Sequence, residues 1–590
     1  MAKRDYTHLS QVELIELVKR RDAHAHFGLV WERDAIERDR KLNDEFVGLR
    51  FFKDLSHGAG PHDNLIIEGD NFDALRHLLM THAGRVNVIY IDPPYNTGST
   101  SQREGWVYND HRFDPSSRYR HSTWLEFMFP RLQLAHDLLA DAGVILISID
   151  DSELYNIKLL MDRIFGPSNF IANIVWNNVT DNNPSRVAIE HEYILVYTKE
   201  KKENPPVWKS ASHPAKEALI RIGEELIAMY SDPAELQRAY TAWFRDNRQF
   251  LGPLDRYKYI DSGGVYTGSQ SVHNPGREGY RYDVPHPVSG RPCKEPLMGY
   301  RFPETTMREL LAESRILFGE DETKIIELKV YAKDFQSKLP SVFELDGRKG
   351  PNELKRIFNG KLPFNNPKPT ELIVELLTFI SRPNDIVLDF FAGSGTTGHA
   401  VLKLNRQDNG KRRFILVSST EAVLDGSVDE KNRNLCRDVC AERIRRVMTS
   451  GDGEEVAFNG TFAYLVAQPI LRHRLELELD NQTIWNAILL LHNMPVSELQ
   501  GSLGWVELPD GCALAYPTGT KQKDVAAFEK CAGKFKGPVL CYAWAVPRFE
   551  AAVPRATVYS LPETLLKKFR RSAALLVDDR PTTLASEAGE

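Results

Sequence analysis

The tetrapeptide Asp92-Pro93-Pro94-Tyr95 constrains the fold of this chain more than any other segment. It directly follows the apolar run 86–91, which has the length and composition of a buried β-strand. Open α/β sheets bind ligands beyond the carboxyl ends of their strands, so an acid and an aromatic ring placed here should line a pocket. The plain alternative is a turn that binds nothing, because aspartates and prolines are common in turns.

Strand and helix patterns alternate along much of the chain. Apolar runs at 64–70, 86–91 and 143–150 are separated by helical patterns, and the same alternation returns around 385–390 and 413–417. Repeated alternation of this kind predicts a largely parallel sheet that is covered by helices on both faces. The predicted fold class is therefore α/β.

At 590 residues the chain is too long for one hydrophobic core. Its patterns divide it into a helical N-terminal region (1–55), a first α/β half (56–198), an insert (199–360), a second α/β half (361–450) and a small mixed C-terminal domain (456–590). The insert interleaves basic and aromatic side chains, which suits phosphate contacts and stacking on unpaired bases. Composition alone favours an ordinary irregular insertion, but the position between two halves of one sheet favours nucleic-acid binding.

The overall charge and the cysteines exclude several classes of protein. A net charge of −6 and a pI near 6.3 argue against a protein that coats nucleic acid by electrostatics alone, so any DNA contact must come from local patches. The six cysteines lack the paired close spacing of a zinc site, and we predict no metal centre. No apolar run is typical of a signal peptide or a membrane span, which predicts a cytoplasmic protein.

A glycine-rich turn follows the strand that ends at Asp389. Its residues are Asp389-Phe390-Phe391-Ala392-Gly393-Ser394-Gly395-Thr396-Thr397-Gly398, and they predict a strand, a tight turn and a helix whose backbone amides can approach a ligand. The three glycines match a dinucleotide fingerprint, so a nicotinamide or flavin enzyme is one hypothesis. However, Asp389 would repel a pyrophosphate and would attract an ammonium group, such as that of a methionine moiety. Glu421, after the next strand, is placed to accept hydrogen bonds from ribose hydroxyls.

The tetrapeptide and the turn together favour methyl transfer to an amino group. An exocyclic amine of a base is a poor nucleophile because its lone pair is delocalised into the ring. Asp92 and the carbonyl group of Pro93 could accept both amino hydrogens and stabilise the positive charge that develops on the nitrogen. Tyr95 could stack on a base that has been extruded from the duplex.

These motifs resemble those of the amino-group DNA methyltransferases, which use S-adenosylmethionine. The similarity includes residues 92–98 and 389–397, and the catalytic motif precedes the cofactor motif, as in the beta group of that family. Residues 28–32, 64–70 and 121–125 most resemble the modification (Mod) subunit of type III restriction-modification systems. The resemblance implies a Rossmann-like methyltransferase sheet with an inserted target-recognition domain, a helical N-terminal lead-in and a small mixed C-terminal domain.

The resemblance also implies roles for individual residues. Asp92, Pro93, Pro94 and Tyr95 would be catalytic. Asp389 would hold the amino group of the methionine moiety, Glu421 the ribose and Asp70 the adenine ring. The turn from Gly393 to Thr397 would hold the carboxylate of the methionine moiety, and Lys368 and Pro369 would close the pocket. The implied cofactor-binding residues are Asp70, Lys368, Pro369, Asp389, Phe391, Gly393, Ser394, Gly395, Thr396, Thr397 and Glu421.

The predicted function is site-specific methylation of adenine N6 in double-stranded DNA, with S-adenosylmethionine as the cofactor. The resemblance implies a homodimer that works beside a separate restriction subunit with helicase and nuclease activity. The first residue of the catalytic motif is Asp92 rather than a serine, and the resemblance to the family implies that this favours adenine N6 over cytosine N4. Three alternatives stay open: a cytosine-N4 methyltransferase, a solitary methyltransferase, and a DNA-recognition subunit of a larger defence complex.

Overall fold

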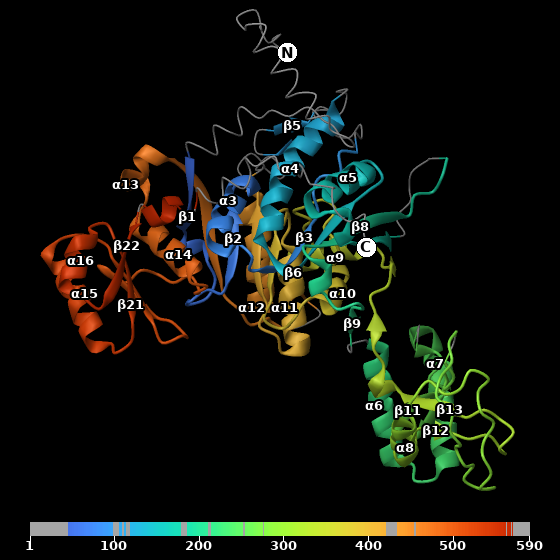
Figure 1. Cartoon of the computed structure of the whole chain (residues 1–590). Helices are drawn as coiled ribbons and strands as arrows, with labels where there is room; N and C mark the ends of the chain where they lie inside the picture. Colours follow the sequence, from blue (N-terminus) through green and yellow to red (C-terminus); the bar gives the residue numbers. More distant parts are fainter. Residues whose placement is uncertain are drawn as a thin grey trace, which may run out of the picture. The chain divides into compact units, whose positions relative to one another are not determined.

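The computed structural model forms two compact units, Val207–Leu339 and the rest of the chain (Figure 1). It describes residues 45–97, 106–108, 111–113, 119–178, 186–210, 214–251, 254–274, 276–420, 434–453, 456–561, 563–567 and 569. Residues 1–44 lie outside these residues, and they make up most of the predicted helical N-terminal region. Glu421 also lies outside them.

A ten-stranded sheet forms the centre of the larger unit, in the order β1-β18-β2-β17-β16-β3-β6-β8-β7-β15. Its strands are β1 (Glu45–Phe51), β2 (Asn64–Glu68), β3 (Val86–Ile91), β6 (Leu139–Ile149), β7 (Phe170–Asn177), β8 (His191–Thr198), β15 (Val342–Glu344), β16 (Ile386–Asp389), β17 (Arg413–Ser418) and β18 (Phe462–Leu471). The strands from β18 to β6 in this order run parallel, whereas β1, on one side, and β8, on the other, are antiparallel to their neighbours. A hairpin of β4 (Trp106–Tyr108) and β5 (His111–Phe113) lies outside this sheet.

Helices pack on both faces of the sheet, as the alternation predicted. The helices are α3 (Asn71–His82), α4 (Arg120–Leu138), α5 (Leu154–Phe165), α9 (Lys349–Ile357), α10 (Thr370–Ile380), α11 (Thr396–Asp408) and α12 (Glu442–Ser450), the last preceded by a π-helix at Leu435–Ala441. Ile415 and Val417 of β17 join the core formed with α3, α4 and α5. Leu416, between them, points to the other face and packs on Gly398 of α11. Its Cδ1 atom lies 2.8 Å from the point that a Cβ atom would occupy if Gly398 had a side chain. Strands buried on both faces explain the nearly continuous apolar runs.

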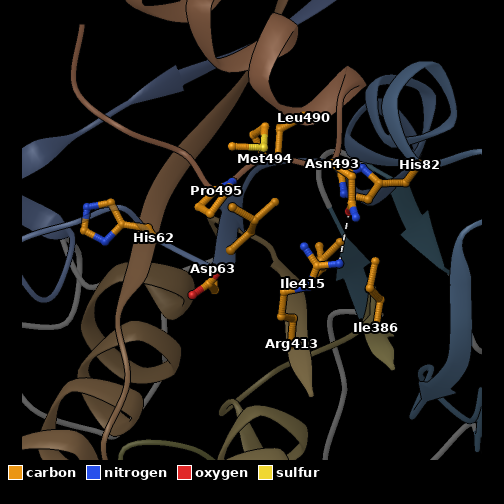
Figure 2. Close-up of a pocket in the computed structure, with 11 residues that line it drawn as sticks. His62, Asp63, His82, Ile386, Arg413, Ile415, Leu490, Asn493, Met494 and Pro495 are labelled. Carbon is orange, nitrogen blue, oxygen red and sulfur yellow. Dashed lines mark hydrogen bonds between the residues drawn. The ribbon is translucent and has the colours of Figure 1, made fainter. Parts of the chain in front are cut away.

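The amino ends of the central strands are covered by the C-terminal part of the chain. Figure 2 shows Ile386 and Arg413, the first residues of β16 and β17, facing Leu490 and Met494. Arg413 Nη2 donates a hydrogen bond of 3.0 Å to Asn493 Oδ1. The remaining cavity has a volume of about 10 Å³, which is room for about one water molecule. The C-terminal segment therefore covers the amino ends of β16 and β17.

Two predicted boundaries were wrong. Residues 45–51 were predicted as part of a helical region but form strand β1, because Phe46 and Val47 are buried against apolar residues of the C-terminal segment. The predicted C-terminal domain, 456–590, contributes β18 to the central sheet, where it pairs with β1 and β2. These pairings join segments about 400 residues apart, which local sequence patterns do not report.

The rest of the C-terminal segment forms its own small sheet, as the prediction of a mixed domain expects. The strands β19 (Leu503–Glu507), β20 (Ala513–Pro517), β21 (Val539–Ala543) and β22 (Ala556–Ser560) follow one another in the sheet, with helices α13 (Leu475–Glu478), α14 (Asn481–Leu491), α15 (Gln522–Lys534) and α16 (Val546–Ala552) (Figure 1). Trp485 of α14 packs with Phe46 and Val47 of β1 in one apolar cluster. This cluster joins the small sheet to the edge of the large one.

The smaller unit, Val207–Leu339, lies within the predicted insert 199–360 and is shorter at both ends. Its helices are α6 (Pro214–Met229), α7 (Pro233–Leu251) and α8 (Glu304–Ala312), and its strands are β9 (Lys209–Ser210), β10 (Tyr259–Asp261), β11 (Gly264–Ser271), β12 (Ile316–Leu317), β13 (Glu327–Tyr331) and β14 (Ser337–Lys338). Leu219, Tyr240 and Tyr257 belong to its own buried core. No helix among the described residues of either unit is long and apolar enough to cross a bilayer.

Candidate active site

Asp92 and Asp389 lie beside each other at the carboxyl edge of the sheet. Asp389 is the last residue of β16, Asp92 directly follows β3, and these two strands are parallel neighbours. After β3 the chain continues to β6 on one side, whereas after β16 it continues to β17 on the other side. A point where consecutive strands diverge in this way is where open α/β sheets bind their ligands. The two predicted motifs, distant in the sequence, therefore flank one switch point, where the general rule for open α/β sheets places the ligand crevice.

Asp92 belongs to a cluster of charged and polar groups that comes from four segments. Lys368 Nζ lies 3.1 Å from Asp92 Oδ1 and 2.9 Å from Glu192 Oε2. The same ammonium donates a hydrogen bond of 2.7 Å to the Tyr95 hydroxyl group, which in turn donates one of 2.8 Å to Glu192 Oε2. Asn178 Nδ2 donates to the other oxygen of Glu192 at 3.1 Å. The cluster holds two carboxylates and one ammonium.

The charges in this cluster shift one another's ionisation. Burial raises the pKa of Asp92, Lys368 opposes the rise, and the nearby carboxylate of Glu192 adds to it. Burial also disfavours the charged form of Glu192, but Lys368 and the hydrogen bonds hold its pKa below the usual range. Burial likewise opposes the charge on Lys368, yet the two carboxylates hold its pKa above the ordinary value. The arrangement therefore keeps a charged lysine beside Asp92.

The backbone of the Asp-Pro-Pro-Tyr segment is held by neighbouring side chains. The buried Trp124 of α4 donates a hydrogen bond of 2.7 Å from Nε1 to the carbonyl oxygen of Pro94. Asn96 has a positive φ of 57° and donates from Nδ2 to Glu153 Oε1 at 2.6 Å. With two prolines and these two anchors, the segment has little freedom to move. The side chain of Asp92 is nevertheless 27% exposed, so a substrate can reach it.

Asp389 is bound by its own turn. It is 3% exposed, and its oxygens accept hydrogen bonds from the backbone amide of Phe391 at 3.0 Å and from Thr397 Oγ1 at 2.5 Å. Burial raises the pKa of Asp389 to about 7, although both hydrogen bonds oppose the rise. Gly393 and Gly395 have φ values of 49° and 81°, a region that glycine occupies without strain. The turn therefore brings its backbone close to a buried carboxylate.

A buried arginine supports the back of this turn. Arg443 of α12 donates from Nη1 to Ser394 Oγ at 3.2 Å and to Thr396 Oγ1 at 2.8 Å. Its Nη2 atom donates to Glu353 Oε2 at 2.9 Å. The hydroxyl groups of Ser394, Thr396 and Thr397 are thus directed to protein partners. What the turn offers to a ligand is its backbone amides.

Glu353, His399 and Asp452 form a group whose ligand atoms lie within 4.8 Å of one another, close enough to hold a metal ion. Two cations already face the two carboxylates of this group. Arg443 binds Glu353, and Lys403 Nζ lies 3.9 Å from Asp452 Oδ2. Burial lowers the pKa of His399. Because the two cations balance the two carboxylates, the group has no excess negative charge to attract a metal ion, and the arrangement suits an internal ion-pair network behind the turn.

The other predicted cofactor residues lie at or near the same edge. Asp70 follows β2, caps helix α3 through the Phe72 amide at 2.7 Å, and accepts a hydrogen bond of 3.2 Å from Arg131 Nη2. Pro369 is the residue before α10. Phe391 is 8% exposed and packs with its ring centroid 6.0 Å from that of Phe127. Glu421 was predicted to bind the ribose and lies outside the described residues.

Three parts of the site were missed or differently placed by sequence reasoning. Lys368 was predicted to close the cofactor pocket, which stays a prediction, and the sequence did not predict that its ammonium contacts the side chains of Asp92 and Tyr95. Glu192 was not identified at all, although an acid inside the apolar strand His191–Thr198 is a detectable signal. Arg443 was also missed, because a charged residue in a charged helix carries no such signal.

Comparisons with known proteins identify the class. A family model described as a DNA methylase (N6_N4_Mtase) matches residues 86–428, more than half of the chain. The Mod subunit of the type III restriction-modification enzyme EcoP15I from Escherichia coli is 46% identical over 454 residues, which cover 72% of this chain and 69% of that protein. The StyLTI Mod subunit from Salmonella typhimurium is 34% identical over 442 residues, which cover 70% of this chain and 60% of that protein.

Solved structures give weaker similarity. The PvuII DNA methyltransferase (cytosine-N4-specific) has 10% sequence identity and a TM-score of 0.29, over 62% of this chain and 90% of its own. The family model and the relatives therefore carry the assignment. The chain is an amino-group DNA methyltransferase, and its cofactor is S-adenosylmethionine. Within that class, it belongs to the family of Mod subunits of type III restriction-modification enzymes.

Proposed function

We propose that this protein methylates adenine at N6 in double-stranded DNA, at a specific sequence and on a base extruded from the helix. One observation carries the proposal: the carboxylates of Asp92 and Asp389 flank one crevice on neighbouring parallel strands. Tyr95 brings an aromatic ring to the same crevice, within 4.8 Å of the ammonium that contacts Asp92. A carboxylate with a ring beside it suits a planar base with an exocyclic amine.

The residues around Asp389 fit the cofactor. The carboxylate of Asp389 is deeply buried at the end of its strand and suits the ammonium of the methionine moiety. The backbone amides of the turn from Gly393 to Thr397 suit its carboxylate at the start of helix α11, except that of Gly395, which donates to the carbonyl oxygen of Ala392. We assign Asp70 to the adenine ring, Glu421 to the ribose, and Phe391 to the wall of the pocket. When bound, S-adenosylmethionine supplies a methyl group that is activated by a sulfonium.

The residues around Asp92 act on the target amine. Asp92 and the carbonyl oxygen of Pro93 accept the two amino hydrogens and so draw the nitrogen lone pair out of conjugation with the ring. As the new nitrogen–carbon bond forms, the nitrogen becomes positively charged, and the carboxylate of Asp92 stabilises that charge and accepts the proton. Tyr95 stacks on the base and holds the nitrogen in line with the methyl group.

We assign DNA recognition to the unit Val207–Leu339. The described surface of this unit exposes Tyr259 and Tyr280, which are 48% and 52% exposed, and Arg281 is half exposed. Exposed rings beside guanidinium groups suit contacts with DNA bases and phosphates. The names of the relatives support a partner as well, since a Mod subunit is one part of a restriction-modification enzyme. We therefore propose a cytoplasmic homodimer that works with a separate restriction subunit containing the helicase and nuclease.

The test is to express the chain in cells whose DNA lacks N6-methyladenine and to sequence their DNA with a method that detects modified bases. We expect N6-methyladenine within one short sequence, and no modification in cells that express the Asp92→Ala variant. N4-methylcytosine would replace the adenine assignment by the cytosine alternative. Unmodified DNA, from a chain that binds both cofactor and DNA, would support the alternative of a recognition subunit.

A further inference from the structure

Lys368 occupies the place beside Asp92 from which a target amine would donate its hydrogen bonds. Its ammonium lies 3.1 Å from Asp92 Oδ1 and 4.8 Å from the centre of the Tyr95 ring. In the proposed function, an exocyclic amine of a base stacked on that ring donates to the same carboxylate. The ammonium and the amine are therefore competitors for Asp92.

The contacts of Lys368 show where it can go. An ammonium has three hydrogens, and this one has three acceptors: Asp92, Glu192 and the Tyr95 hydroxyl group. A lysine that moves off Asp92 keeps the contacts at 2.9 Å with Glu192 and 2.7 Å with Tyr95. Its charge then stays paired with a carboxylate, so the displacement avoids the large cost of an unpaired buried charge.

Glu192 is held in place by its surroundings while Lys368 moves away from Asp92. It extends from β8, which lies inside the central sheet between β6 and β7. Its Oε1 atom is held by Asn178 Nδ2 at 3.1 Å, which leaves Oε2 to receive both Lys368 and Tyr95. The only part of the cluster that has to move is the flexible lysine side chain.

We infer that Lys368 masks Asp92 in the free protein, and that Glu192 is the positioning residue that retains Lys368 when the target base displaces it. The inference rests on the proposed function, because it assumes that Asp92 receives the target amine. It predicts a specific penalty for the loss of Glu192. Without the second carboxylate, Lys368 pairs with Asp92 alone, and the incoming base has to break the only ion pair that the lysine has.

The test compares Glu192→Gln, Lys368→Met and the double variant with wild type in single-turnover methylation of a DNA duplex. We expect Glu192→Gln to lower the methylation rate about tenfold, as loss of one charged hydrogen bond suggests. Removal of the lysine as well should restore most of that loss, because the mask is then gone. Glu190→Gln is the matched control: it removes an exposed carboxylate two residues away and should leave the rate at the wild-type value.

A second measurement follows base extrusion through the fluorescence of 2-aminopurine placed beside the target adenine, so that the target keeps its N6 amine and its extrusion unstacks the fluorescent neighbour. Glu192→Gln should reduce the fluorescence rise on binding, and the double variant should recover it. Equal rates and equal fluorescence in Glu192→Gln and wild type would overturn the inference, as would losses that simply add in the double variant. A wild-type protein that modifies no DNA would instead overturn the proposed function, and 2-aminopurine fluorescence would still report whether Lys368 opposes base entry.

Discussion

The two carboxylates at the crevice are held in opposite ways. Asp389 takes its hydrogen bonds from the Phe391 amide and the Thr397 hydroxyl group, two and eight residues further along the chain. Asp92 contacts Lys368, which also binds Tyr95 and Glu192, and those hydrogen bonds join residues 273 and 176 positions apart. Asp389 is 3% exposed and the side chain of Asp92 27% exposed. The cofactor half is thus formed by local contacts and is buried, whereas the catalytic half is assembled by the tertiary fold and is partly exposed.

The largest expected effect tests whether the two halves are separate. Asp92→Ala removes the acceptor for the target amine, and we expect the methylation rate constant to fall about 10³-fold, as for other losses of transition-state stabilisation. The affinity for S-adenosylmethionine, measured by calorimetry, should change by less than about 3-fold, since no contact of Asp389 is lost. Asp92→Asn is the control of similar shape. An equal loss of cofactor binding would show that the halves are one unit.

The next effect is the mirror image of the first. Asp389→Ala should weaken S-adenosylmethionine binding by about 10 to 100-fold, the value of a hydrogen bond to a charged group. Calorimetry gives the affinity, and the methylation rate at saturating cofactor should stay near that of wild type. Thermal unfolding of the variant serves as the control for folding, because the Thr397 and Phe391 contacts are also lost. A normal affinity would remove Asp389 from the cofactor site.

The local, buried character of Asp389 also predicts a pH dependence. Its pKa in the free protein is raised to about 7 by burial. The cofactor ammonium pairs with the ionised carboxylate, which is present above pH 7 and lost as the pH falls below it. We therefore expect cofactor affinity to decline as pH decreases from 8 to 6, approaching about tenfold per pH unit at the low end. The same titration with Asp389→Asn should be flat across this range.

The same contrast explains what the sequence could and could not predict. The motifs occupy the contiguous residues 92–98 and 389–398, and each lies at the end of an apolar run, so its place at a strand end follows from local pattern alone. The pattern also places both strands in one parallel sheet, but their adjacency comes from the tertiary structure. Glu192 and Lys368 meet Asp92 only through tertiary structure, and no local pattern reports contacts between such distant segments.

The C-terminal segment shows the same limit. A small mixed domain was predicted here, and its strands β19 to β22 pair with neighbours in the sequence. The pairing of β18 with β1 and β2 was not predicted. Residues 462–471 carry the pattern of a strand, but that pattern does not specify which strands pair with it. The buried Arg443 beneath the glycine turn escaped for a similar reason, because its partners Glu353 and Ser394 come from other elements.

The smallest expected effect separates the ring of Tyr95 from its hydroxyl group. Tyr95→Phe keeps the surface on which a base would stack and removes one hydrogen bond to Glu192 and one from Lys368. We expect the methylation rate to fall about 3-fold for Phe and at least about tenfold for Ala, since stacking on an aromatic ring is worth about 1 to 3 kcal/mol per base. Single-turnover rates on the same duplex measure both. Equal losses for Phe and Ala would mean that the hydroxyl group, through its contacts with Glu192 and Lys368, matters more than the ring, and the open half of the crevice would then depend on its charged cluster rather than on stacking.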